Sequence, residues 1–578
     1  MAARAHENCL LNRIRSAPDG ACNCHENDSC KAILGSRPTL AHARQAGPRT
    51  CARGSFPDST GYRIPCGLSA RQNTPAGNVR SAQLRLLHFT PAVSLAIDQA
   101  KYRSLRATIV EAADADLFQG LPALARPIPP ATPLPFFQYI STVRDNAIAA
   151  FHDDTFHQPL TEIKYFKLHT FLVNDPAGIK HVLIDNAANY IRGGVEQRTL
   201  RAWPIKGFAV QDGEEWRQRR RTMSSSFDYP SILENSASIM DAAGRILSRW
   251  TALPPQTVID VHAEMASLTL EIISRIVFSV ESAEFARIME LTSRRYQGDR
   301  IVHLLDFAPL LDRAWKFYKG YRQRHIFKDL SASVDRLIVR RNGRATRSEN
   351  DFLGRLLEKK DTQTGSGLST QELHNQIITI LGTGHETAAL ALMWTWYLLS
   401  QRPLQEAKLH AELDEVLGGR APAFGDLARL PYTRMVVEEA LRLYPPIHTM
   451  PWRGALRNDE VCGVKIPKGA IVSIVPWVLH RHSKLWDHPE QFDPERFSPD
   501  RSGCRSRFAY LPFGVGPRVC IGASFAMTEI MLILATVAQR YRLRLVPGHK
   551  VEPRGLVSLK ARYGMEMTLQ SRPSTLPI

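Results

Sequence analysis

A cysteine in a glycine-rich loop near the C-terminal end of the chain has the surroundings that a metal-bound thiolate requires. Cys520 lies within the run Phe513-Gly-Val-Gly-Pro-Arg-Val-Cys-Ile-Gly522, and a helical pattern follows from 523 to 540. A thiolate is a soft ligand for iron, and it must be deprotonated, shielded from water and reached by backbone N–H groups. Phe513 can cover the sulfur, Gly516 and Gly522 permit tight turns, and the dipole of the following helix favours an anion. The loop therefore predicts Cys520 as an iron ligand, and the alternative is a buried structural cysteine.

Proton-transfer chemistry is suggested by two residues in the middle of a long predicted helix. Ser369-Thr-Gln-Glu372 forms a capping box, and helix-forming residues continue to Ser400, shortly before Pro403. At the centre, Glu386 and Thr387 place a carboxylate next to a hydroxyl that can hold water, which suits proton delivery in a dry pocket. The alternative for Thr387 is a hydroxyl that bonds back to a carbonyl and only bends the helix.

Taken together, these motifs resemble those of the cytochrome P-450 family. The cysteine loop matches the haem-binding signature F-x-x-G-x-R-x-C-x-G at every defined position. The central helix is similar to A-G-x-[D/E]-T-[T/S], with Thr383 in place of the usual Ala and Ala388 in place of the second Thr or Ser. Three further motifs are Trp216 to Arg220 (W-x-x-x-R), Glu439 to Arg442 (E-x-x-R) and Pro494 to Phe497 (P-E-R-F). The resemblance extends from about Ile128 to the C-terminus.

The resemblance implies a haem b cofactor, iron protoporphyrin IX, held by the thiolate of Cys520. The side chains that it implies as donors to the haem propionates are those of Trp216, Arg220, Arg453, His480 and Arg518. Glu439, Arg442 and Arg496 would form a buried ionic cluster with a structural role, in which two arginines share one carboxylate and backbone carbonyls. An exposed pair of Glu439 and Arg442 is the alternative, and it would contribute little to stability.

The activity that the resemblance implies is monooxygenation. One atom of dioxygen enters an apolar small molecule, with electrons from a separate acidic ferredoxin or flavodoxin-type donor, because the stretch after Cys520 is too short for reductase domains. Glu386 and Thr387 would deliver protons, and the apolar pocket walls would come from the helix before Thr383 and from residues 447–450 and 190–208. One alternative is a haem-thiolate sensor or ligand-binding protein. Another is a peroxide-using or isomerising relative, against which the Glu386–Thr387 pair argues.

The pattern of elements predicts a fold that is mainly α with a minor β part. Long amphipathic helical patterns run from 177 to about 417, and short β-branched runs between 454 and 475 are split by turn residues. The resemblance places the haem between the long central helix and the cysteine loop of a single large haem-thiolate domain.

Three segments are expected along the chain. Residues 128–578 form the haem-thiolate domain, and residues 81–127 are a helical lead-in with a Pro-rich boundary. Residues 1–80 lack a sustained apolar period, so we expect them to be disordered or a mis-assigned extension.

Composition and charge narrow the function classes. The 578 residues are 44% hydrophobic and 22% charged, which excludes collagen-like, wholly disordered and small disulfide-rich classes. Lys and Arg number 74 against 56 Asp and Glu, a net charge of +18, which favours an acidic partner or an anionic surface. We expect an acidic redox protein as the partner, and no nucleic acid. Residues 377–399 are apolar enough to span a membrane, but His385 and Glu386 would be costly in lipid. We therefore expect a buried central helix and no membrane span.

The cysteines and the first residues bear on location. Six of the nine cysteines precede residue 67, and the N-terminus shows no apolar run typical of a signal peptide. The run Cys22-Asn-Cys-His25 lacks the spacing of a zinc site or of covalent haem attachment, so we expect no metal there. A cytoplasmic protein is expected, and an Arg-rich organellar transit segment is the alternative.

Overall fold

The computed structural model describes residues 122–165, 168–192, 206–279, 287–289, 291–292, 312–342, 351–358, 360–361 and 365–572. All of them belong to one compact unit, Asp98–Ile578. The extension expected at 1–80, with its Cys22–His25 run, and residues 81–121 of the lead-in expected at 81–127 lie outside the described residues. Residues 122–135 run without helix or strand up to the first described helix.

The described part of the unit is mainly helical, as the sequence predicts. Its helices are α3 (Phe136–Asn146), α4 (Pro176–Lys180), α6 (Gly213–Ser224), α7 (Tyr229–Thr251), α8 (Val261–Phe278), α10 (Asp312–Asn342), α11 (Phe352–Glu358), α12 (Thr370–Gln401), α13 (Pro403–Leu417), α14 (Pro431–Leu443), α15 (Pro476–Leu479), α16 (Pro499–Ser502) and α17 (Ala523–Ala538). Short 3-10 turns connect several of them.

The strands are short and form four small sheets within the described residues. They are β1 (Leu160–Tyr165), β2 (Leu168–Val173), β3 (Tyr190–Arg192), β4 (Val258–Asp260), β5 (Arg453–Ala455), β6 (Asp459–Val461), β7 (Val464–Ile466), β8 (Ile471–Ser473), β9 (Tyr541–Leu545), β10 (Pro553–Gly555), β11 (Leu559–Ala561) and β12 (Glu566–Ser571). The strand orders are β1-β2-β8-β5-β3, β4-β12-β9, β10-β11 and β6-β7. Cys462 and Gly463, with φ of 53° and 74°, make the two-residue turn of the β6–β7 hairpin expected in this region.

Helix α12 begins with the predicted capping box. Ser369 Oγ accepts from the N–H of Glu372 at 3.3 Å, and the Glu372 carboxylate accepts from the N–H of Ser369 at 2.8 Å. The Glu372 carboxylate also pairs with Arg219 of α6, which ties the two helices together. The helix ends at Gln401, and Arg402 is its C-cap. Arg402 precedes Pro403, and the residue before a proline is disfavoured in helical geometry.

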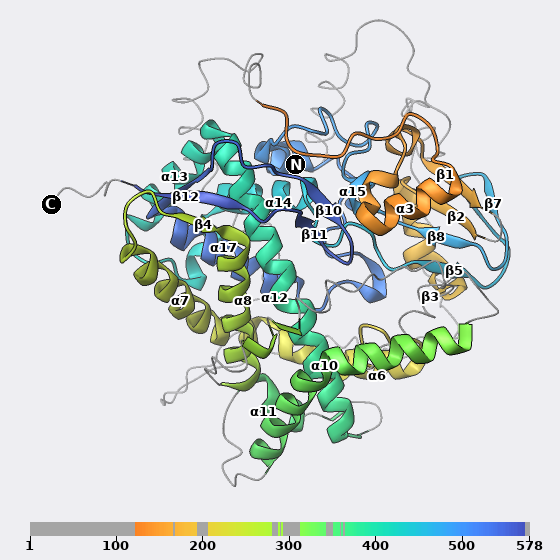
Figure 1. Cartoon of the computed structure of the whole chain (residues 1–578), viewed down its shortest axis with the longest axis horizontal. Coiled ribbons are helices and arrows are strands. Elements are labelled where there is room, and N and C mark those ends of the chain that lie inside the picture. The colour runs from red at the N-terminus through yellow and green to blue at the C-terminus, as the bar shows by residue number, and fades with distance from the viewer. Residues whose placement is uncertain are drawn as a thin grey trace, which may run out of the picture. The chain divides into compact units, whose positions relative to one another are not determined.

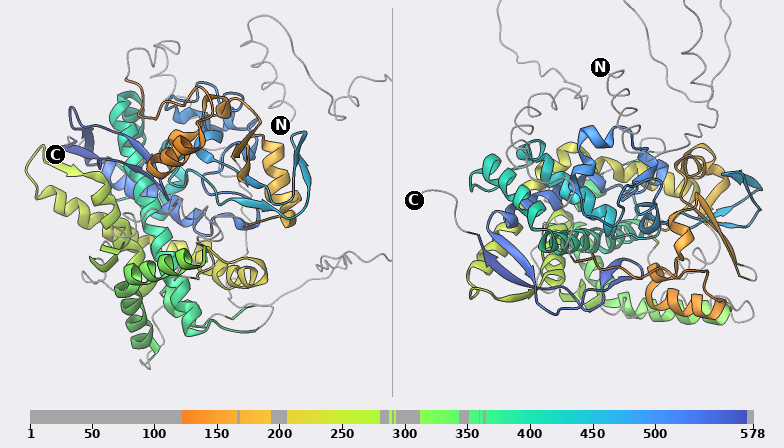
Figure 2. Two further views of the ribbon diagram at one scale, coloured as in Figure 1. Left: turned by 45° about the vertical axis from the view of Figure 1, so that its right-hand side comes forward. Right: turned by 90° about the horizontal axis from the view of Figure 1, so that it is seen from above.

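Helix α12 crosses the middle of the unit (Figure 1). In each view, α7 and the β4-β12-β9 sheet lie on one side of it and the five-stranded sheet lies on the other (Figures 1 and 2). It is the one described helix long and apolar enough to cross a membrane, yet 72% of that 18-residue window is buried inside the protein. Its second half packs into the main core through Leu392, Trp396 and Leu398. The helix is therefore a fixed central support for the residues at its midpoint.

Candidate active site

Cys520 lies in a tight loop between the 3-10 turn Gly516–Arg518 and helix α17. Its N–H donates to the carbonyl oxygen of Phe513 at 2.8 Å, which closes the loop. Gly516 has a φ of +77°, and a Cβ atom there would lie 2.6 Å from the carbonyl oxygen of Leu183. Only glycine fits that position without moving the backbone. The side chain of Cys520 keeps an exposed face, so the loop presents the thiol where a ligand can reach it.

The thiol of Cys520 needs a nearby cation to exist as a thiolate at neutral pH. The surrounding protein atoms raise its pKa, because burial penalises the charged form. The N–H of Gly522 and the guanidinium of Arg220 oppose this effect by stabilising the thiolate. The pKa nevertheless lies above its usual value, so a bound metal cation would be the group that keeps the sulfur deprotonated. This donor set fits the iron of a haem.

Arg220 of α6 supports the cysteine loop through its backbone. Its Nη1 donates to the carbonyl oxygen of Val519 at 2.8 Å. Burial lowers the pKa of Arg220, while Cys520 raises it. The resemblance implies a propionate contact for this arginine, but the structure places it against the residue that precedes the cysteine.

Arg518 and Trp216 lie together. The guanidinium carbon of Arg518 is 4.2 Å from the centre of the Trp216 ring, a cation–π contact. Arg518 also donates to the carbonyl oxygen of Gln211 at 3.1 Å and pairs with the carboxylate of Asp212. The sequence analysis missed Asp212, because the turn before α6, not a motif, brings it to the cysteine loop.

Two more arginines gather beside Arg518. Arg192 on β3 and Arg453 on β5 are directly opposite one another in antiparallel register. Burial lowers the pKa of Arg518 to about 10, and Arg192 and Arg453 add to that lowering while Asp212 opposes it. Like charges opposite one another destabilise a sheet, so this cluster suits an anionic ligand such as the propionates of a haem. The sequence analysis missed Arg192, since only strand pairing places it here.

His480 does not join the arginine cluster, although the resemblance implies that it contacts a propionate. Its Nε2 accepts from the N–H of Leu511 at 2.9 Å, and its Nδ1 faces the carbonyl oxygen of Arg442 at 3.3 Å. Burial, followed by the charge of Arg442, lowers its pKa to about 3, so the ring is neutral. Both nitrogens of this fully buried ring have backbone partners. The expectation is therefore wrong, and His480 ties α14 to the start of the cysteine loop.

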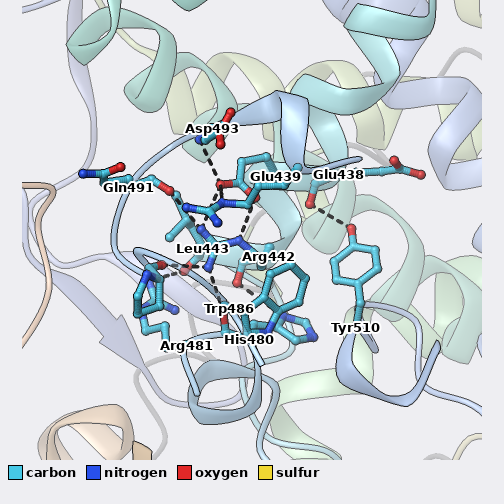
Figure 3. Close-up of polar contacts among 12 residues, drawn as sticks. Glu438, Glu439, Arg442, Leu443, His480, Arg481, Trp486, Gln491, Asp493 and Tyr510 are labelled. Carbon is cyan, nitrogen blue, oxygen red and sulfur yellow. Dashed lines mark hydrogen bonds and ion pairs between the residues drawn. The ribbon is translucent and has the colours of Figure 1, made fainter. Parts of the chain in front are cut away.

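Glu439 and Arg442 form the centre of a buried cluster (Figure 3), which Arg496 joins. Arg442 donates to the Glu439 carboxylate from Nε at 2.6 Å and from Nη2 at 2.8 Å, and Arg496 donates from Nε at 3.2 Å. Backbone oxygens stabilise the positive charge that the single carboxylate leaves unbalanced. Arg442 Nη1 donates to the carbonyls of His480 and Pro489, both at 2.7 Å. All three side chains are buried. The predicted structural cluster is present, and the exposed-pair alternative for Glu439 and Arg442 is wrong.

Three threonines on one face of α12 each donate to the carbonyl four residues earlier. Thr379 donates to Asn375 at 2.7 Å, Thr383 to Thr379 at 2.7 Å, and Thr387 to Thr383 at 2.9 Å. Such bonds compete with the helical ladder and favour a bend. In this structure Thr387 thus has the geometry of the helix-bending alternative. Its oxygen lone pairs remain able to accept a hydrogen bond from water.

Glu386 points toward the β10–β11 hairpin. Its carboxylate pairs with Lys560 of β11, and the hydroxyl of Ser558 donates to it at 3.4 Å. Burial lowers the pKa of Lys560, and Glu386 opposes that shift. The sequence analysis places Glu386 beside Thr387 and does not name Lys560, which lies in a distant segment. The structure thus gives the carboxylate a charged partner on the hairpin.

Residues 447–450 run from the hairpin side of α12 to the cysteine loop. Pro446 accepts from the N–H of Leu559 at 2.9 Å, and the Cε of Met450 would lie 3.3 Å from a Cβ on Gly514. Within this segment Ile447 is 36% exposed. Its expected part in an apolar pocket wall stays a prediction.

The expected wall at 190–208 is described only at its two ends. Tyr190 is buried, and its hydroxyl donates to Asp459 at 2.6 Å, so it does not line a pocket. Phe208 donates its N–H to Gln376 of α12 at 2.8 Å. Residues 193–205 lie outside the described residues.

Comparisons with known proteins agree with this geometry. Residues 128–561 match the cytochrome P-450 family model. Cyclooctatin synthase of Streptomyces melanosporofaciens is 36% identical over 70% of this chain and 87% of the relative. Cyclooctat-9-en-7-ol 5-monooxygenase of the same organism is 33% identical over 68% of this chain and 84% of the relative. Pentalenene oxygenase of Streptomyces avermitilis is 30% identical over 72% of this chain and 91% of the relative.

A solved structure shares the fold. The crystal structure of the cytochrome P450DA heme domain superposes with a TM-score of 0.66 and covers 78% of this chain and 99% of that chain. The sequence identity is 23%, so the similarity concerns the arrangement of the elements.

Proposed function

Because this chain belongs to the cytochrome P-450 family, it is a haem-dependent monooxygenase, and we propose that it hydroxylates a cyclic terpene or a similarly apolar polycyclic molecule. Two relatives are named for oxidation of cyclooctat-9-en-7-ol and of pentalenene. The exposed apolar side chains of Ile447 and Val557 supply surface of the kind that such a substrate would cover. The names of the relatives favour oxygen insertion over the sensor, peroxide-using and isomerising alternatives.

The observation that carries the proposal is the exposed thiol of Cys520 in a closed loop that also carries Arg518, close to Arg192 and Arg453. In the proposal, the thiolate of Cys520 would hold the iron of haem b, and Arg192, Arg453 and Arg518 would hold its propionates. The haem, when bound, supplies the activation of dioxygen and the transfer of one oxygen atom to carbon. The protein holds the thiolate, neutralises the propionates and limits access of water.

Protons enter the balance of the reaction, since a C–H compound, dioxygen, two electrons and two protons give an alcohol and water. We assign their delivery to Thr387 and Glu386. The hydroxyl oxygen of Thr387 accepts a hydrogen bond from a water molecule and fixes its position in the pocket. The carboxylate of Glu386 accepts a proton from solvent and passes it toward that water, when it moves away from Lys560.

Electrons come, in this proposal, from a separate acidic ferredoxin or flavodoxin-type protein. The net charge of +18 favours attraction of such a partner. Helix α6 reaches the cysteine loop through Arg220 and carries Arg217, whose side chain is 62% exposed. A cytoplasmic location is part of the same proposal, because such donors are found there.

The test uses the full chain loaded with haem, a ferredoxin, its reductase and NADPH. Pentalenene and cyclooctat-9-en-7-ol are supplied as trial substrates under isotopically labelled dioxygen. The expected result is a product that carries one labelled oxygen atom and that is not formed by the Cys520→Ser variant. A product with unlabelled oxygen, or NADPH consumption without product for a wide panel of cyclic terpenes, would contradict the proposal.

A further inference from the structure

His448 joins two segments that are far apart in the sequence. It lies between α14 and β5, and its side chain is only 3% exposed. Its Nε2 is 3.0 Å from the carbonyl oxygen of Leu556, and its Nδ1 is 2.9 Å from the hydroxyl of Thr449. Burial lowers the pKa of His448 to about 4, so the ring is neutral and carries one proton. Because a carbonyl only accepts, that proton is on Nε2, and Nδ1 accepts from Thr449.

Each of the two joined segments carries a large exposed apolar side chain next to the hydrogen bond. Ile447, directly before His448, is 36% exposed, and Val557, directly after Leu556, is 42% exposed. Single exposed apolar side chains are ordinary at a protein surface, but these two lie on segments that the same hydrogen bond joins. The hydrogen bond from His448 therefore fixes the two apolar side chains relative to one another.

The base of the β10–β11 hairpin has supports of its own. Asn146 donates to the carbonyl of Pro553 at 2.9 Å and accepts from the N–H of Gly555 at 2.8 Å. The indole N–H of Trp394 donates to the carbonyl of Leu559 at 2.9 Å. These bonds hold the strands. At the tip, Ser558 donates to Glu386 at 3.4 Å, and the shorter bond from His448 holds Leu556, directly before Val557.

The hairpin lies against the ring of His448 with little spare room. A Cβ atom on Gly555 would come within 3.1 Å of Nε2 of His448 and 2.7 Å of Ile148. Loss of the ring would therefore leave a gap beside the tip and the part-buried carbonyl of Leu556 without its donor, and both effects favour displacement of the tip.

We propose that His448 is a positioning residue that sets the separation of Ile447 and Val557, and with it the shape of the apolar wall that the substrate meets. The proposal rests on the proposed function, because it takes these two side chains as part of the pocket of a haem-thiolate enzyme. His448 itself touches neither substrate nor cofactor. It acts through the two neighbours that it holds in place.

Three substitutions of His448 distinguish the effect of losing its bond to Leu556 from the effect of losing its bond to Thr449. The amide nitrogen of His448→Gln reaches the position of Nε2 and retains donation to Leu556. His448→Asn reaches only the position of Nδ1 and loses that donation, and His448→Leu loses both bonds. Trp394→Phe serves as the control, because it removes a buried bond to the same hairpin at Leu559 and leaves the tip bonded to His448.

The first measurement uses two phenylimidazole isomers as probes. Their azole nitrogen binds haem iron and shifts the Soret band, while the position of the phenyl ring reports the shape of the wall. The ratio of the two dissociation constants is expected to change about tenfold in His448→Leu and His448→Asn, which equals about 1.4 kcal/mol. His448→Gln and Trp394→Phe should stay within about twofold of the wild-type ratio.

The second measurement needs no haem chemistry. Hydrogen exchange at the amides of residues 553–561, followed by mass spectrometry, should accelerate in His448→Leu and His448→Asn and be restored in His448→Gln.

The outcomes are distinct. An unchanged isomer ratio in His448→Leu and His448→Asn, even with faster exchange, would overturn the inference and leave His448 with a structural role alone. An equal change of the ratio in Trp394→Phe would also overturn it, because any weakening of the hairpin would then suffice. If the wild-type protein shifts its Soret band with neither isomer, the proposed haem site fails, and the inference fails with it.

Discussion

Arg192 and Arg453 stand directly opposite one another on neighbouring strands although both carry positive charge. A pair of like charges in this position destabilises a sheet by itself. An anion close to both side chains would relieve this repulsion, and Arg518, which pairs with Asp212, adds a further positive charge nearby. Repulsion between the arginines destabilises the haem-free chain. Binding of the anionic propionates would relieve this repulsion and thereby add to the affinity for haem.

The first prediction concerns this pair. Arg192→Leu should weaken haem retention by about tenfold to a hundredfold, because each charged hydrogen bond contributes about 1.5–3 kcal/mol. The same change should leave the haem-free protein as stable as before or more stable. Transfer of haem to excess apomyoglobin measures the first effect and thermal unfolding of apo-protein the second. The exposed Arg217→Leu is the control, and equal haem loss in that variant would contradict the assignment.

The second prediction identifies the iron ligand. Cys520→Ser should abolish the absorption band of a thiolate-bound, reduced, CO-saturated haem, because a hydroxyl does not donate charge to iron as a thiolate does. Cys462→Ser should retain the band, since burial raises the pKa of the Cys462 thiol to about 11 and keeps it protonated. Retention of the band in Cys520→Ser would require another ligand.

The third prediction concerns Thr387. Thr387→Ala should still bind substrate and consume NADPH, but more of the reducing equivalents should appear as hydrogen peroxide. A tenfold loss of product per NADPH corresponds to about 1.4 kcal/mol in relative barriers. Thr387→Ser retains the hydroxyl and should retain most of the coupling. If Thr387→Ala stays coupled, Glu386→Gln decides whether the carboxylate alone delivers the proton, and full coupling in both variants would remove the assignment of a proton relay.

The fourth prediction compares two neighbouring glutamates on α14. Glu439→Gln leaves two buried arginines without their counter-charge and should lower the free energy of unfolding by about 3–5 kcal/mol. Glu438→Gln removes a pair with Arg434, whose side chain is 64% exposed, and should lower it by about 1 kcal/mol or less. Urea unfolding of the two variants, with haem content as a second measure, tests the difference. Similar values for the two would mean that the buried cluster does not stabilise this region.

The fifth prediction is a pH dependence. His410 is buried, and both of its ring nitrogens lack a hydrogen-bond partner among the described residues. Burial, followed by Arg572, Arg542 and Arg544, lowers its pKa from 6.5 to about 3. Between these values the unfolded chain binds the proton and the folded chain does not, so stability falls as the pH falls below 6.5.

Replacement of His410 removes this effect. At about pH 5 the titration of His410 lowers the free energy of unfolding of the wild-type protein by about 2 kcal/mol. Between about pH 8 and about pH 5, the free energy of unfolding of His410→Phe should therefore fall less than that of wild type. Urea unfolding at both pH values gives the comparison. The exposed His157→Phe should lose as much as wild type, and an equal loss in His410→Phe would show that His410 titrates normally.

Local spacing predicts the parts of the site that lie on one element. Cys520 with its glycines, the capping box of α12 and the i,i+3 pair of Glu439 and Arg442 all depend on neighbours within a few residues. Their geometry is set by backbone rules that a short motif contains. These features occur in the structure where the sequence places them.

Contacts between distant segments were not predictable in the same way. Arg192 reaches the arginine cluster through the register of β3 with β5, and Lys560 reaches Glu386 through a hairpin that follows the cysteine loop. His480 was misassigned because the direction of a ring nitrogen depends on which backbone groups pack around it, here those of Arg442 and Leu511. Tertiary packing decides these positions, and a single sequence does not contain that packing explicitly.

Cys520 and Arg518 on the cysteine loop and Arg192 and Arg453 on two strands come from segments that lie between residues 192 and 520, so the cationic site exists only after those segments have met. Binding of the cofactor is for this reason thermodynamically linked to folding. The apparent stability of the chain rises as RT ln(1 + [L]/Kd), where L is free haem. Free haem at concentrations above Kd therefore stabilises the folded chain, and removal of haem lowers its apparent stability.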